Sequence, residues 1–96
     1  MIPPVLSALE LALGRLYLGP ASPGELRAAY ERVSRQGVYV HGGWAAVEAV
    51  VRSLEVQGLV GLDGEGRLYL ARDRLHPAAA RMAELAAGDL KRAGVV

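Results

Sequence analysis

Apolar and polar residues alternate along the chain in a pattern that predicts helices first and a pair of strands near the middle. Residues 3–18 are apolar on all sides except for one strip, formed by Ser7, Glu10 and Gly14. Two prolines at the start of this run and Gly19-Pro20 after it are typical helix boundaries. A helix this apolar must be buried on most sides, so we expect it to pack partly against a second copy of the chain.

Two further helices are predicted by start signals and by apolar residues at helical spacing. Residues 22–37 open with Ser22, Pro23 and Glu25, the pattern of a capping box, and end at Gly37. After an extended "VYV" and a short "HGG" turn, a third helix is expected over 44–57, with Gly58 just beyond its end. The core-facing stripes are Leu26, Ala29, Tyr30 and Val33 in the second helix, and Val47, Val50, Val51 and Leu54 in the third.

The segment after Gly58 changes to a period of two, which predicts a β-hairpin over about 59–71. The runs "LVGLD" and "RLYLA" are separated by Gly64-Glu65-Gly66, a common hairpin loop length with a glycine at the left-handed position. Period-two alternation places four apolar side chains on one face, and opposite charges pair near the tip. The expected cross-strand pairs are Asp63 with Arg67, Leu62 with Leu68, and Val60 with Leu70.

A last helix is expected over about 77–93, covering the first helix or its copy in a partner chain. Its apolar stripe is formed by Met82, Leu85, Ala86 and Leu90. The 96 residues are enough for one domain. The predicted fold class is mainly α with a small β-hairpin, in the order helix, helix, helix, hairpin, helix.

The segments "GELRAAYERV" and "VEAVVRSLEVQGLV" resemble winged helix-turn-helix domains. Similar sequence patterns occur in PadR- and MarR-type transcriptional regulators and in the winged-helix domains of archaeal origin-recognition proteins. The resemblance spans residues 3–71. It implies that the third helix enters the major groove of double-stranded DNA while the hairpin, the wing, contacts the backbone. A homodimer formed through the first and last helices would then engage two half-sites.

Composition narrows the classes of function. Hydrophobic residues make up 52% of the chain, and eleven basic against ten acidic residues give a net charge of +1. This is a weak electrostatic footprint for DNA binding. Ten of the eleven basic residues are arginine, a bias seen in some thermophile families. No cysteine is present, and no apolar run is long enough to cross a bilayer. We expect a cytoplasmic protein of a thermophilic prokaryote.

Candidate DNA contacts are the polar residues on the predicted outer surface of the third helix and the wing. Arg52 is the only cation that the third helix turns outward, although a solvated surface arginine is an equally ordinary role for it. Arg67 lies at the wing, where acidic neighbours also allow a solvated hairpin of mixed charge. Trp44 is expected to be a core or interface anchor. The predicted set of DNA contacts is Arg35, His41, Arg52, Ser53, Arg67 and Arg72.

No convergent set of a nucleophile, a base and an oxyanion donor is present, so an enzyme is not expected, and neither a metal nor a cofactor is implied. Two functions remain open. The first is a transcriptional regulator that binds duplex DNA as a homodimer. The second is a protein-interaction adaptor that docks a partner through an apolar, nearly neutral surface. Their dependence on salt separates them, because phosphate contacts weaken steeply as salt rises.

Overall fold

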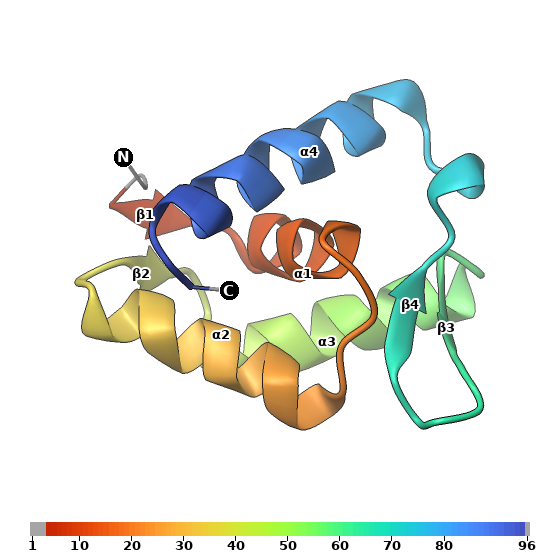
Figure 1. The fold of residues 1–96 in the computed structure, drawn as a ribbon, viewed down its shortest axis with the longest axis horizontal. Helices are drawn as coiled ribbons and strands as arrows, with labels where there is room; N and C mark the ends of the chain where they lie inside the picture. Colours follow the sequence, from red (N-terminus) through yellow and green to blue (C-terminus); the bar gives the residue numbers. More distant parts are fainter. Residues whose placement is uncertain (1–3, 96) are drawn as a thin grey trace.

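The computed structural model describes residues 4–95, which form four α-helices, a β-hairpin and a second, very short strand pair (Figure 1). The elements in chain order are β1 (Val5–Leu6), α1 (Ala8–Tyr17), α2 (Pro23–Arg35), β2 (Tyr39–Val40), α3 (Gly43–Val56), β3 (Val60–Leu62), β4 (Leu68–Leu70), a 3₁₀ turn η1 (Arg72–Arg74) and α4 (Pro77–Arg92). The mainly α class with a small hairpin is therefore confirmed.

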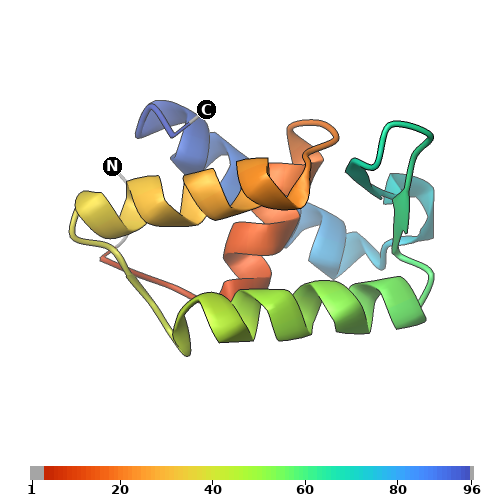
Figure 2. The ribbon, with the colours of Figure 1, turned by 90° about the horizontal axis from the view of Figure 1, so that it is seen from below.

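Helix α1 lies at the centre of the fold, between α4 on one side and the layer of α2 and α3 on the other (Figures 1 and 2). Its most extensive contacts are with α4 and then with α3. Leu11, Ala12 and Leu16 are almost completely buried. The chain thus covers its own apolar helix, and α1 needs no second copy of the chain to bury it.

The first helix begins later than its apolar pattern indicates. Ser7 is the N-cap of α1, and its hydroxyl accepts a hydrogen bond from the backbone N–H of Glu10 at 3.0 Å. The carboxylate of Glu10 accepts in return from the Ser7 backbone N–H. This capping box ends the extended segment in which β1 pairs in parallel with β2. The expected start at Pro3 and Pro4 is wrong for Pro4, which precedes β1, while Pro3 lies outside the described residues.

The hairpin has the predicted register, with Val60 opposite Leu70 and Leu62 opposite Leu68. The backbone N–H of Asp63 donates to the Arg67 carbonyl at 2.9 Å, and Gly66 has a φ of +75°, the left-handed conformation that the loop requires. Of the four apolar side chains on the inner face, only Leu62 is exposed, at 59%. Leu62 therefore lies beyond the part of the hairpin that the helices cover.

A third segment extends the hairpin, and the sequence pattern does not predict it. Ala21, in the connection between α1 and α2, pairs antiparallel with Leu68 of β4. Each residue donates its backbone N–H to the other's carbonyl, at 2.9 and 2.8 Å. Ala21 is fully buried. This bridge fastens the hairpin to the start of α2.

Helix α4 packs on α1 through Ala86 and Leu90 of the predicted stripe and through Ala83 and Ala87 outside it, all of which are buried. Met82 of the stripe is half-buried against the core, and only Leu85, which is 53% exposed, was assigned to it wrongly. The close approach depends on Gly14 of α1, where an added Cβ would lie 2.8 Å from the Cβ of Ala86. Gly14 is therefore a contact residue of the α1–α4 interface and not part of a polar strip.

We predict that Gly14→Ala and Gly88→Ala change stability in opposite directions. Both glycines lie inside helices, where alanine is favoured by about 1 kcal/mol. At Gly88 the new methyl meets only the flexible end of Arg92, so the free energy of unfolding should rise by about 0.5–1 kcal/mol. At Gly14 the methyl forces α1 and α4 apart, and the free energy of unfolding should fall by about 1 kcal/mol. Chemical denaturation measures both, and an equal rise in the two variants would contradict the close packing.

Candidate binding groove between α2, α3 and the hairpin

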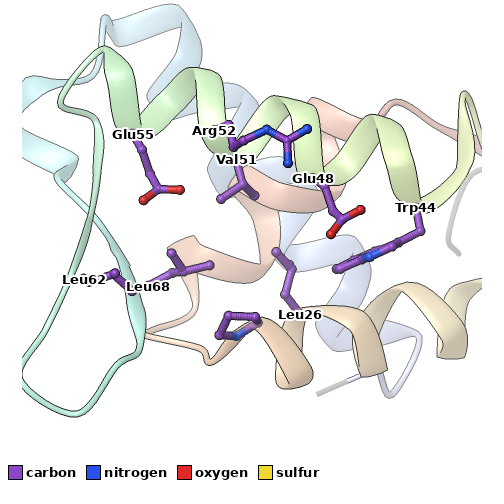
Figure 3. Close-up of a pocket in the computed structure, with 9 residues that line it drawn as sticks. Leu26, Trp44, Glu48, Val51, Arg52, Glu55, Leu62 and Leu68 are labelled. Atoms are coloured by element: carbon purple, nitrogen blue, oxygen red, sulfur yellow. The ribbon is translucent and has the colours of Figure 1, made fainter.

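A groove of about 230 Å³ opens where the start of α2, the outer side of α3 and the hairpin meet (Figure 3). The bridge from Ala21 to Leu68 brings the hairpin to this position, because Ser22 and Pro23 follow Ala21 directly. Apolar side chains from all three elements form most of the lining: Pro23 and Leu26 from α2, Trp44 and Val51 from α3, and Leu62 and Leu68 from the hairpin.

The polar part of the lining comes from one stripe of α3. Glu48, Arg52 and Glu55 are spaced at i, i+4 and i+7, which places them along one side of the helix, above the apolar floor (Figure 3). All three side chains are exposed. A groove with an apolar floor and two carboxylates beside one arginine suits an apolar group with a cation next to it.

Trp44 forms the end of the groove farthest from the hairpin (Figure 3). Its ring lies 5.5 Å from that of Tyr30, and the guanidinium of Arg27 lies 5.2 Å from the indole centroid. Arg27 also forms an ion pair with Glu31 at 3.7 Å. Trp44 is thus held by α2 on one side and half-buried, as expected for an anchor residue.

Arg67, the predicted wing contact, forms ion pairs with carboxylates of the hairpin. Its guanidinium lies 3.4 Å from Asp63 and 3.4 Å from Glu65. It also lies close enough to Glu25 of α2 to contribute to the lowered pKa of that carboxyl, which is due mainly to hydrogen bonds with Ser22. Two carboxylates paired with one arginine leave it little attraction for a phosphate.

Arg52 and Ser53 lie on the exposed side of α3, as predicted. The Arg52 side chain has no ion pair or hydrogen bond with any residue in the described range 4–95. Ser53 accepts a hydrogen bond from Gln57 Nε2 at 3.0 Å. Two glutamates flank Arg52 along the helix, so its cationic charge is offset locally.

The other predicted contacts do not join this surface. Arg35 ends α2 and His41 follows β2, at the end of the molecule away from the hairpin (Figure 1). The His41 side chain does not cap α3. Arg72 is turned toward the end of α1, where it donates to the Tyr17 carbonyl and lies 4.0 Å from the ring centroid of Tyr17. The six residues are therefore divided among three places in the fold.

The charged residues in and around the groove are mostly acidic. We define the groove face by its charged side chains. It includes those that line the groove and those within three residues of a lining residue of α2 or the hairpin. It also includes any charged side chain that forms an ion pair with a member of these two groups. Four arginines and six carboxylates meet this definition, giving the face a net charge of −2: Arg15, Arg27, Arg52 and Arg67 against Glu25, Glu31, Glu48, Glu55, Asp63 and Glu65. An acidic face repels a phosphate backbone.

The groove is smaller than the roughly 300–1,000 Å³ typical of small-molecule and cofactor sites. An apolar cavity of about 150 Å³ accommodates a benzene-sized group, so the groove has room for one or two apolar side chains. Within residues 4–95, no three His, Asp or Glu side chains converge to hold a metal ion. In the same range, no helix combines the length and apolar character required to span a bilayer.

No protein family matches the sequence, and neither a curated protein nor a solved structure matches the chain. The chemistry of the groove therefore follows from its own side chains alone.

Most of the groove-lining residues are absent from the sequence-based set, which favoured cations. The lining includes Glu48 and Glu55, the two carboxylates beside Arg52, and the exposed Leu62. One signal was present in the sequence: Glu48, Arg52 and Glu55 share one side of the third helix. The position of Leu62 at the uncovered end of the hairpin depends on tertiary packing and has no local signal.

We predict that the pKa of Asp63 lies below its ordinary value. Its carboxylate accepts a hydrogen bond from the backbone N–H of Arg67 at 2.9 Å, the main cause, and from that of Glu65 at 2.9 Å, while burial opposes the shift. Because the folded state has the lower pKa, the stabilisation is present at neutral pH and is lost as the pH falls through that value.

Carboxyl NMR titration tests this, with Arg67→Met as the informative variant. Methionine keeps the backbone N–H, so the pKa of Asp63 should remain lowered in that variant. A return to the value of an unfolded aspartate in Arg67→Met would show that the guanidinium, and not the hairpin backbone, holds the carboxylate.

Proposed function

We propose that the chain is a winged helix-turn-helix module that docks a protein partner in the groove between α2, α3 and the hairpin. The order of elements supports the winged-helix assignment: a helix, a single β-bridge residue at Ala21, two helices and a hairpin that pairs with that residue. The observation that carries the functional part is the combination of an apolar floor with a groove face of net charge −2.

The chemistry of the groove specifies its occupant. Leu26, Val51 and Leu68 are already buried and form a fixed floor, while Leu62 remains exposed above them. An apolar side chain placed on this floor would bury Leu62 and gain the hydrophobic free energy of both surfaces. Glu48 and Glu55 would attract lysine or arginine next to that side chain. The partner is therefore an amphipathic helical segment with apolar anchors and flanking basic residues.

Duplex DNA is the second candidate, favoured by the exposed and unpaired Arg52 on the helix that usually enters the major groove in winged-helix proteins. The charge around Arg52 argues against it as the main function. Glu48 and Glu55 lie on the same side of α3, and the hairpin arginine, Arg67, is paired with two carboxylates. Six carboxylates near the duplex would oppose the release of counterions that drives DNA affinity.

Selection from a display library of helical peptides tests the docking proposal. Peptides of about 15 residues are long enough for helix formation. Enriched sequences should carry apolar residues at helical spacing next to lysine or arginine. In Leu62→Ser, binding of these peptides should weaken about fivefold, because about 1 kcal/mol of hydrophobic burial is lost. Glu48→Lys should weaken it at least as much. Isothermal titration calorimetry measures both.

The matched control is Leu85→Ser, since Leu85 is also about half-exposed but lies on α4, outside the groove. The affinity of Leu85→Ser for the selected peptides should equal that of the unmodified chain. Enrichment of acidic peptides, or an equal loss in Leu62→Ser and Leu85→Ser, would contradict docking in the groove.

Gel-shift titration with a duplex at low salt tests the second candidate. If α3 and the hairpin contact DNA, Arg52→Ala and Arg67→Ala should each weaken duplex binding. The acidic groove face predicts instead that neither substitution changes it. A marked loss of affinity in both variants would favour the duplex over a protein partner.

A further inference from the structure

The C-terminal ends of α2 and α4 meet at the end of the molecule away from the hairpin (Figures 1 and 2). The guanidinium of Arg32 donates to the Val95 carbonyl at 3.3 Å, and Gln36 Nε2 donates to the Ala93 carbonyl at 2.9 Å. These bonds join residues about sixty positions apart in the chain. They also supply donors to carbonyls beyond the last turn of α4.

Four basic residues gather where these helices end, and we call them the basic end: Arg32, Arg35, Lys91 and Arg92. One carboxylate, Asp89, lies among them and pairs with Arg92, so the net charge of this region is +3. The groove face carries a net charge of −2. The near-neutral total of the chain thus conceals a division into an acidic face and a basic end.

Cations in the last turn of a helix are stabilised by its unpaired carbonyls. Contact with these carbonyls does not account for all four residues of the basic end. Arg32 and Gln36 already donate to the carbonyls at the junction. The side chains of Arg35 and Lys91 are exposed and make no ion pair or hydrogen bond with any described residue. Two cations on two different helices are therefore available at one junction.

We propose that the basic end binds the phosphate backbone of a nucleic acid. Arginine presents a planar fork that matches phosphate oxygens, and lysine adds a point charge. Only the ends of the two helices lie here, and neither offers a side that could contact base edges in a groove. The contact is therefore with phosphates alone and is independent of base sequence. The site is separate from the groove, which leaves the chain able to hold a basic protein segment and a phosphate backbone at the same time.

Fluorescence anisotropy with a duplex of about 20 base pairs tests the proposal, at several salt concentrations. The logarithm of affinity falls by about 0.9 per phosphate contact for each tenfold rise in salt. The double variant Arg35→Glu, Lys91→Glu should lower affinity at least tenfold at low salt and reduce the salt slope by about 2. Thermal unfolding checks that this double variant and the control double variant described next remain folded.

The control is Arg52→Glu, Arg81→Glu, which changes the net charge of the chain equally and alters exposed arginines of α3 and α4 away from the basic end. It should retain most of the affinity and the full salt slope. An equal loss in both double variants would show a general charge effect, and a larger loss in the control would locate the contact on α3. Either result, or no binding of the unmodified chain at low salt, would overturn the proposal. Peptide docking in the groove is measured separately and does not depend on this outcome.

Discussion

The backbone pairing between Ala21 and Leu68 is the constraint on which the rest of the structure depends. Two hydrogen bonds, at 2.9 and 2.8 Å, join the connection between α1 and α2 to the second strand of the hairpin. A two-stranded hairpin is marginally stable alone, and this bridge adds a third segment to it. Because Ala21 is fully buried there, the hairpin is held against the helices rather than projecting freely. The start of α2 and the strand β4 are thereby kept side by side.

This arrangement produces the groove and also determines its charge. With the hairpin fixed beside the start of α2, Leu62 and Leu68 complete an apolar floor with Leu26 and Val51. Within the hairpin, Arg67 pairs with Asp63 and Glu65, so its charge is offset by its own neighbours. Among the described residues, the cationic side chains without an ion pair or hydrogen bond are Arg52 and, at the opposite end of the molecule, Arg35 and Lys91. Under the proposed function, this distribution of charge favours a basic protein partner at the hairpin side.

Local patterns predicted the helices and the hairpin register well, because capping residues, glycine positions and cross-strand pairs are local features. They failed where two local interpretations competed. Ser7 and Glu10 form a capping box, yet they were assigned to a polar strip inside a longer helix. Arg67 was assigned both to a pair with Asp63 and to a phosphate contact, and an arginine held by carboxylates serves the second role poorly. The groove could not be predicted, because the bridge at Ala21 and the exposed position of Leu62 arise only from tertiary packing.

The most direct test of this account is a map of backbone amide shifts in ¹H–¹⁵N NMR spectra while a selected basic peptide is added. The account predicts that the largest changes occur in 23–27, 44–55 and 60–68, the segments that enclose the groove. Changes concentrated instead on α4, or spread evenly over the chain without saturation, would contradict the claim that this acidic, apolar groove is the docking site.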